Sequence, residues 1–238
     1  MFPELLKVPD INIVHIVTLS SQSVTTMYDG IKPDKWKKWD IPVMEINSIS
    51  EEAEKIKSLS PDLILMCGWR QKIPQSIISI PTKGIIGFHP TLLPIGRGPA
   101  PIINSILEGF VKSGVTMFYL SDELDSGDII GQESFTISEE DNAQAVYNKV
   151  IKATKKLIKT YVPLIKSGKS PRIPQDHSKA TYFPKRTLED NEINFDDDLS
   201  LIMRKVRAFS TPYRGAFFLI NGERLIVWKA SVEKDLDK

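Results

Sequence analysis

Residues Gly84–Gly109 read GIIGFHPTLLPIGRGPAPIINSILEG, and residues Ser113–Ile130 read SGVTMFYLSDELDSGDII. Each segment contains an apolar run, typical of a buried strand, that leads into a loop with an ionisable side chain. The first loop holds His89 among prolines and glycines, and the second holds Asp125 among other acidic residues. In open α/β sheets, ligands and chemistry collect beyond the carboxyl ends of the strands. The two segments therefore predict an α/β protein with a site near His89 and Asp125.

Further apolar runs extend this pattern into an alternation of strands and helices. Strands are predicted over Ile11–Leu19, Ile41–Ile46, Asp62–Gly68, Gly84–His89, Gly114–Leu120 and Ile129–Ile137. Helices are predicted over Ser48–Leu59, Pro74–Ile80, Pro101–Gly109 and Asn142–Gly168. The first helix opens with Ser48 and Glu51 at capping-box spacing, and the polar stretch Ser20–Asp40 is expected to be a loop with one irregular helical turn. This alternation predicts a Rossmann-like, mostly parallel sheet flanked by helices.

The pattern changes at Gly168, where a proline-rich segment ends the long amphipathic helix and predicts a domain edge. Residues 1–168 are expected to form the larger domain, and residues 169–238 a small C-terminal α+β subdomain. A helix is predicted over residues 199–209, and a β-hairpin follows it. The Asn-Gly pair at positions 221–222 is a strong signal for the hairpin turn.

The composition argues against several classes of protein. The 31 basic and 30 acidic residues leave a net charge of +1, so a broad nucleic-acid-binding surface is not expected. No apolar run approaches the ~18 residues of a membrane span, and the amino terminus lacks signal-peptide features, which together predict a cytoplasmic protein. No His/Cys spacing indicates a metal site, and the glycine motifs of dinucleotide and phosphate loops are missing. The single cysteine, Cys67, is expected to be buried in a strand.

His89 and Asp125 are expected to lie on loops after neighbouring strands. A carboxylate beside an imidazole fixes the tautomer of the ring and favours its charged form. Such a pair can donate a hydrogen bond to a developing oxyanion and help move a proton near neutral pH. The residues alone leave a structural role open, because a loop histidine before proline is often a satisfied polar residue. The acidic run at 121–128 is also compatible with an ordinary turn.

Several blocks of the chain occur in a fixed order: FHPTLLP at Phe88–Pro94, RGPAP at Arg97–Pro101, GVTM at Gly114–Met117 and LDSGDI at Leu124–Ile129. Together they resemble the signature of the formyltransferases that use 10-formyltetrahydrofolate. A later block, RAFSTPYRGAF at Arg207–Phe217, resembles the part that follows the folate domain in the tRNA and sugar members of that family. The resemblance implies a formyltransferase catalytic, folate-binding domain and 10-formyltetrahydrofolate as co-substrate.

The resemblance also implies roles for individual residues. His89 would stabilise the tetrahedral oxyanion, and Asp125 would hold His89 and help take the proton of the attacking amine. Arg97 would either pair with a phosphate of the acceptor or brace its loop. The family carries an Asn where this chain has Gly87, and Asn104, a backbone N–H or a water would replace that donor. The pterin would lie against two loops, for which the binding residues are Trp69, Gln71, Lys72, Ile73, Glu123 and Leu124; ordinary packing is the alternative for Trp69 and Ile73.

By this resemblance the favoured function is formyl transfer to the amine of a nucleotide-linked amino sugar. The hairpin near the end of the chain leaves little room for the barrel of the tRNA enzyme, and the balanced charge does not indicate an RNA-binding face. The alternatives are a non-catalytic folate- or nucleotide-binding relative, suggested by Gly87, and an enzyme that formylates an aminoacyl group on tRNA or a carrier. A homodimer is compatible with these readings. The resemblance also suggests that the sheet lacks its opening strand, because residues 1–6 match the end of the family's first helix.

Overall fold

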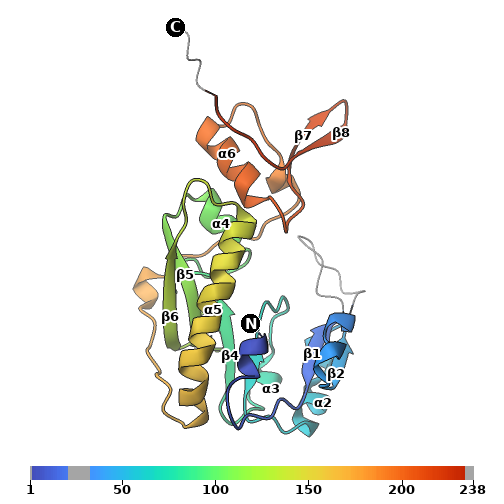
Figure 1. The fold of residues 1–238 in the computed structure, drawn as a ribbon, viewed down its shortest axis with the longest axis vertical. Helices are drawn as coiled ribbons and strands as arrows, with labels where there is room; N and C mark the ends of the chain where they lie inside the picture. Colours follow the sequence, from blue (N-terminus) through green and yellow to red (C-terminus); the bar gives the residue numbers. More distant parts are fainter. Residues whose placement is uncertain (1, 21–32, 234–238) are drawn as a thin grey trace.

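Figure 1 shows the fold in the computed structural model, which describes residues 2–20 and 33–233. The largest sheet has the strand order β3–β4–β5–β6. Its strands are β3 (Ile64–Met66), β4 (Ile85–His89), β5 (Lys112–Tyr119) and β6 (Ile129–Thr136). The strands β3 and β4 are parallel, whereas β4–β5 and β5–β6 are antiparallel pairs. The α/β class predicted from the sequence is confirmed.

The antiparallel direction of β5 was not indicated by the alternation of strands and helices. A parallel pair needs a crossover that returns the chain to the starting edge of the sheet. The segment between β4 and β5 contains only one short helix, α4 (Pro101–Leu107), and does not make this return. The loop after β5 then turns the chain back on itself, so that β6 runs antiparallel to β5.

A second, two-stranded sheet pairs β1 (Ile16–Leu19) in parallel with β2 (Val43–Ile46). A hydrophobic cluster that includes Ile46, Ile77 and Ile85 joins it to the main sheet. Within residues 2–20 and 33–233, no strand pairing connects the two sheets.

The helix predicted over Ser48–Leu59 is shorter than expected and is preceded by a separate 3-10 turn. The turn covers Ile49–Glu51 and the helix α2 covers Ala53–Ser58. The Ser48 side chain makes no capping hydrogen bond, because its Oγ lies 2.8 Å from Oγ of Ser50 instead. The capping-box prediction was therefore wrong.

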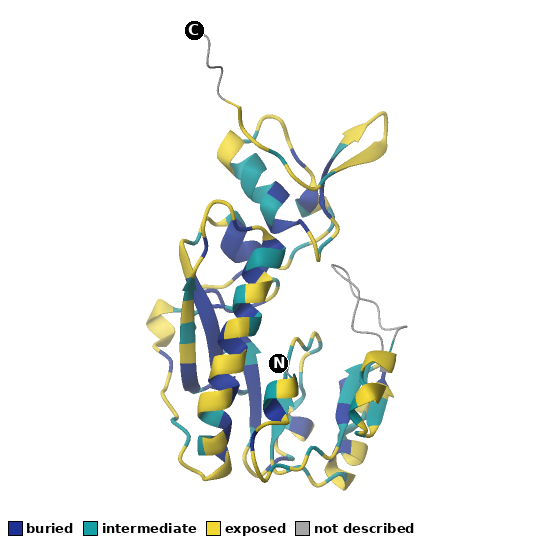
Figure 2. Cartoon of the chain, viewed as in Figure 1, coloured by how far each residue is buried: buried dark blue, intermediate teal, exposed yellow. Residues whose placement is uncertain are grey.

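The long helix α5 (Ala143–Lys166) packs along the main sheet (Figure 1) and confirms the predicted amphipathic helix. Asn142 caps its first turn, because Oδ1 of Asn142 accepts a hydrogen bond of 2.9 Å from the Ala145 N–H. The face toward the sheet is buried and the opposite face is exposed (Figure 2). Fully burying each large apolar side chain, such as Leu157 or Ile158, contributes about 1.5–3 kcal/mol, and this packing fixes the sheet that carries the site.

Helix α6 (Leu199–Ala208) and the hairpin that follows it lie at one end of the molecule, where α6 contacts α4 (Figure 1). The hairpin of β7 (Ala216–Ile220) and β8 (Glu223–Val227) confirms its prediction. Its turn uses positive φ angles of 52° at Asn221 and 85° at Gly222, which an Asn-Gly pair adopts readily. The domain edge at Gly168 stays a prediction.

The remaining described elements are short. The helices are α1 (Phe2–Leu5) and α3 (Gln75–Ile78), and the 3-10 turns cover Pro33–Lys35, Lys37–Trp39, His177–Lys179 and Glu189–Asn191. Residues 21–32 of the predicted Ser20–Asp40 loop lie outside the described part of the chain. Among the helices that the structure describes, none has the length and apolar character needed to cross a membrane.

Candidate active site

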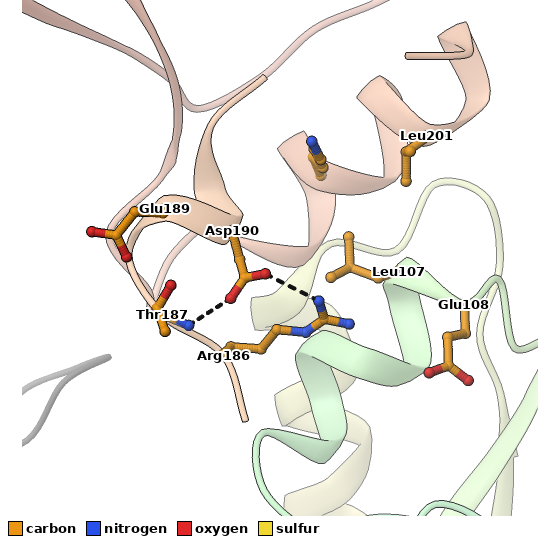
Figure 3. Close-up of a pocket in the computed structure, with 8 residues that line it drawn as sticks. Leu107, Glu108, Arg186, Thr187, Glu189, Asp190 and Leu201 are labelled. Atoms are coloured by element: carbon orange, nitrogen blue, oxygen red, sulfur yellow. Dashed lines mark hydrogen bonds and ion pairs between the residues drawn. The ribbon is translucent and has the colours of Figure 1, made fainter. Parts of the chain in front are cut away.

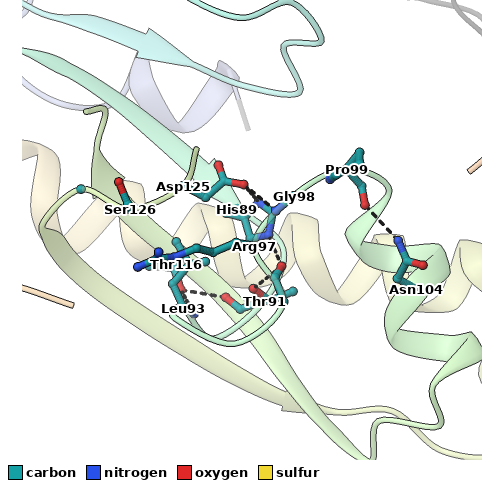
Figure 4. Close-up of polar contacts among 12 residues, drawn as sticks. His89, Thr91, Leu93, Arg97, Gly98, Pro99, Asn104, Thr116, Asp125 and Ser126 are labelled. Carbon is teal, nitrogen blue, oxygen red and sulfur yellow. Dashed lines mark hydrogen bonds and ion pairs between the residues drawn. The ribbon is translucent and has the colours of Figure 1, made fainter. Parts of the chain in front are cut away.

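The imidazole of His89 and the carboxylate of Asp125 lie side by side, with 3.5 Å between Nδ1 and Oδ2 (Figure 4). The Nε2 atom of His89 lies 2.7 Å from the carbonyl oxygen of Gly96. A carbonyl oxygen only accepts hydrogen bonds, so Nε2 carries a hydrogen and Nδ1 is the nitrogen that faces Asp125. The Gly98 N–H donates to Oδ2 of Asp125 at 2.8 Å. Both reactive groups are thus held in fixed orientations by backbone groups of the same loop.

His89 is the last residue of β4 and lies opposite Thr116 of β5. The Thr116 hydroxyl donates to the Thr91 carbonyl at 2.7 Å and accepts from the Leu93 N–H at 3.0 Å. These two bonds fix the start of the loop directly after His89. The carbonyl of Gly96, further along the same loop, accepts from Nε2 at the edge of the ring, and His89 is only 6% exposed.

Asp125 reaches His89 because the loop after β5 folds back onto that strand. The Tyr119 N–H donates to the Asp128 carbonyl at 2.9 Å, and a Cβ added at Gly127 would lie only 1.9 Å from the Tyr119 oxygen. Asp125 has a φ of 51°, in the left-handed region, which aspartate adopts more readily than most residues with a side chain. The close return of the loop explains how an antiparallel β5 still delivers its carboxylate to His89.

Arg97 lies on the loop between β4 and α4, which also follows His89, and it is only 1% exposed. Its guanidinium donates to Oε1 of Gln175 and to the hydroxyl of Tyr182 (3.0 Å). Of the two roles considered from the sequence, these buried contacts favour bracing of the loop over an ion pair with an acceptor phosphate. Gln175 was not among the predicted site residues, because it directly follows the proline-rich segment, which predicted only a domain edge.

Asn104 is completely buried on α4 and its amide is fully engaged. The Nδ2 group donates to the carbonyls of Pro99 and Pro184, and Oδ1 accepts from Nε of Arg186 at 2.6 Å. In Figure 4 the Asn104 side chain points to Pro99 and away from His89. These contacts leave no free N–H on Asn104 for a formyl oxygen, so we assign it a structural role in place of the donor role considered above.

At Gly87, the space that a side chain would need is filled. A Cβ at this position would lie 2.9 Å from Cδ1 of Leu120 and 3.0 Å from Cε1 of Phe118, its cross-strand partner. Restoring the family's Asn here therefore requires the neighbours to move.

We expect Gly87→Asn to lower the free energy of unfolding by about 1–3 kcal/mol, as overpacked cores do, and to leave kcat no higher than in the parent. Chemical denaturation and steady-state rates measure both effects, with Gly87→Ala as the matched variant that adds bulk without an amide. A faster enzyme with unchanged stability would show that position 87 is open to a donor.

The residues predicted to bind the pterin lie on two separate loops. Because β3 and β4 are parallel, the loop after β3 emerges at the same edge of the sheet as His89. Gln71 bridges that loop to the one after β2, accepting from the Ile49 N–H and donating to the Asn47 carbonyl. Trp69 and Ile73 pack against the smaller core cluster, whereas Lys72, Glu123 and Leu124 are exposed. The indole N–H of Trp69 is buried and has no acceptor among the described residues.

A hollow of about 540 Å³ lies between α4, α6 and residues 186–190 (Figure 3). Two of its charged side chains already bind one another, since Arg186 pairs with Asp190 at 3.3 Å. None of the predicted site residues lines this hollow. We therefore place the candidate site at His89 and Asp125.

Two other chemistries find no support in the part of the chain that the structure describes. The search of these residues finds no group of three or more His, Cys, Asp or Glu side chains that is arranged to hold a metal ion. Burial raises the pKa of the Cys67 thiol to about 12, so the reactive thiolate is scarce near neutral pH. Cys67 is thus unsuited to act as a nucleophile.

An imidazole and a carboxylate at the loops of an α/β sheet define a site suited to acyl or one-carbon group transfer. Residues 43–162 match the family model described as formyl transferase, and residues 185–238 match the formyl transferase C-terminal domain. The chain belongs to the formyl transferase family.

Individual relatives are consistent with this assignment. The chain is 38% identical over 192 residues to a methionyl-tRNA formyltransferase of Bacillus licheniformis, an alignment that covers 80% of this chain and 60% of that one. It therefore spans about 60% of the length of this curated relative. Among solved structures, a sugar N-formyltransferase from Shewanella has a TM-score of 0.72 at 20% identity, covering 94% and 100% of the two chains. HypX from Aquifex aeolicus in complex with tetrahydrofolic acid has a TM-score of 0.69 at 21% identity, covering 94% and 39%.

Proposed function

We propose that this chain transfers a formyl group from 10-formyltetrahydrofolate to a primary amine. The observation that carries the proposal is the His89–Asp125 pair, with 3.5 Å between Nδ1 and Oδ2, in a member of the formyl transferase family. Both groups are oriented by hydrogen bonds to the loop at Gly96 and Gly98. Such fixed orientation is what general acid–base and oxyanion catalysis require.

The proposed mechanism uses Nδ1 of His89 and the carboxylate of Asp125. The neutral amine attacks the formyl carbon, and a new C–N bond forms while the carbonyl oxygen takes negative charge. His89 acts here as an imidazolium: Nε2–H donates to the Gly96 carbonyl, and a second proton on Nδ1 stabilises the oxyanion. Asp125 accepts the proton that the amine releases. The intermediate collapses by breaking the bond between the formyl carbon and N10 of the folate, and N10 takes up the proton that Asp125 accepted. The Gly96 carbonyl holds the ring in place throughout.

The folate co-substrate is proposed to lie against the loop of Trp69–Ile73 and the backbone of Glu123–Asp125. The parallel pairing of β3 and β4 supports this placement, because it puts the first loop at the His89 edge. The structure of HypX with tetrahydrofolic acid supports the choice of folate for this fold.

For the acceptor, we propose the amine of a nucleotide-linked amino sugar. The balance of 31 basic and 30 acidic residues supports a small acceptor over an RNA, and the similar fold of a sugar N-formyltransferase agrees with it. A second candidate is an aminoacyl group on tRNA, which is favoured by the 38% identity to a methionyl-tRNA formyltransferase.

A panel of acceptors separates these functions. We expect a nucleotide-linked amino sugar to release tetrahydrofolate from 10-formyltetrahydrofolate at least about 10²-fold faster with the parent protein than with Asp125→Asn. Methionyl-tRNA and a carrier-bound aminoacyl group are tested beside it. Turnover of methionyl-tRNA alone would move the assignment to the second candidate, and folate binding without turnover of any acceptor would indicate a non-catalytic relative.

A further inference from the structure

Residues 173–183, from the C-terminal part of the chain, contact both of the loops that carry the proposed catalytic residues. Ile173 and Ile129 exchange two backbone hydrogen bonds of 2.8 and 3.0 Å. Further along, the Arg97 N–H donates to the Thr181 carbonyl, and the Phe183 N–H donates to the Arg97 carbonyl. Backbone hydrogen bonds thus attach this segment to the His89 loop and to β6, the strand after the Asp125 loop. Gln175 lies between these two attachments.

The Gln175 amide connects the two loops directly. Its Nε2 group donates to the carbonyls of Asp125 (2.9 Å) and Gly127 (2.8 Å). Its Oε1 atom accepts from Nη2 (2.7 Å) and Nε (3.2 Å) of Arg97. A guanidinium has only donors and a carbonyl only accepts, so this amide fits in a single orientation. Gln175 is only 6% exposed, and both hydrogens and both lone pairs of its amide are used.

Asp125 needs such support because of its backbone. Its φ of 51° lies in the left-handed region, which residues with a side chain adopt less often than glycine, and the surrounding contacts hold the turn in this conformation. The Gly98 N–H binds the side-chain carboxylate of Asp125. Gln175 binds the backbone carbonyls of Asp125 and Gly127 in the same turn. We propose that Gln175 is a positioning residue that clamps the 125–127 turn and thereby sets the distance between the Asp125 carboxylate and His89.

Arg97 completes the clamp by fixing the amide of Gln175. Among the described residues no carboxylate lies within ion-pair distance of Arg97. Its guanidinium donates to Gln175 and to the hydroxyl of Tyr182, and its Nη2 lies 3.4 Å from Nδ1 of His177. A buried cation with neutral partners is costly to disturb. The side-chain amide of Gln175 is consequently held in one orientation.

The variant Gln175→Glu tests the clamp selectively. The carboxylate keeps the acceptor for Arg97 and gains an opposite charge there, but it cannot donate to the carbonyls of Asp125 and Gly127. We expect kcat for formyl transfer to fall about 10²-fold, the cost of a displacement near 1 Å, with KM for the folate changed far less. The unfolding temperature should stay within about 4 °C of the parent. Gln144→Glu on the surface of α5 is the matched control and should leave kcat unchanged.

The kinetic result rests on the proposed function, so a second readout is made without substrates. The Gly98 amide donates to the Asp125 carboxylate, and its proton chemical shift therefore reports on the carboxylate position. We expect this resonance to move in Gln175→Glu and in Asp125→Asn, and to stay in Gln144→Glu. If Gln175→Glu fails to fold, Gln175→Asn, whose amide is one methylene too short, is expected to give a smaller shift of the same resonance. An unchanged Gly98 resonance in a folded Gln175 variant would overturn the clamp, whatever the activity of the protein.

Discussion

His89→Ala is expected to lower kcat for formyl transfer by about 10²–10⁴-fold, the usual contribution of a positioned acid–base group. His89 is the last residue of β4, and its Nδ1 lies 3.5 Å from Oδ2 of Asp125. In the proposed mechanism the same Nδ1 also binds the formyl oxygen. Without it, the oxyanion loses a donor and Asp125 loses its partner. Initial rates of tetrahydrofolate release with the accepted amine measure the effect.

The removal of a buried ring also disturbs packing, so the rate is interpreted only for folded protein. The matched control is His15→Ala, a half-buried histidine directly before β1 in the smaller sheet, which should change kcat little. Full activity of a folded His89→Ala protein would remove His89 from the mechanism.

The second large effect is expected at Gly127. An alanine Cβ there would lie 1.9 Å from the Tyr119 oxygen and 3.0 Å from its carbonyl carbon, both backbone atoms that no rotamer change can move. The loop must therefore separate from β5, which breaks the bond between the Tyr119 N–H and the Asp128 carbonyl. We expect Gly127→Ala to lower the free energy of unfolding by about 3 kcal/mol or more and to abolish most formyl transfer, because Asp125 leaves His89.

Gly168→Ala is the matched comparison for this variant. Gly168 has a φ of 71°, but a Cβ there would contact nothing within 4 Å. Its replacement should cost only the left-handed backbone penalty of about 1–2 kcal/mol and leave the site intact. Urea denaturation and activity of both variants test this; equal losses of stability would show that the Gly127 loop tolerates displacement.

The parts of the fold that follow from local pattern could be predicted from the sequence. The period of Val146, Val150 and Leu157 defines one face of α5, and the Asn-Gly pair at 221–222 defines the hairpin turn. The direction of β5 could not be predicted, since an apolar run carries no information on which way a strand runs in a sheet. The Ser48 capping box failed because a competing bond to Ser50 satisfies the hydroxyl.

Some residues of the candidate site could be predicted from the sequence, and others could not. His89 and Asp125 stand out in the sequence because each follows an apolar run on a loop rich in Gly, Pro or acidic residues. Gln175 has no such signal, since its importance comes from two carbonyls some fifty positions earlier in the chain. The engagement of Asn104 by Arg186 is equally invisible, because it depends on the packing of the C-terminal part against α4. Contacts between distant segments therefore decide which polar residues are free for chemistry.

The rate of the double variant His89→Ala/Asp125→Asn, compared with the two single variants, is the measurement that tests most directly whether the pair acts as one unit. Groups that work together lose their effect together, so that losing the second costs little once the first is gone. We predict that the double variant transfers formyl groups at about the rate of His89→Ala alone. If the two residues act independently, the rate loss of the double variant equals the product of the two single losses. That result would contradict this account.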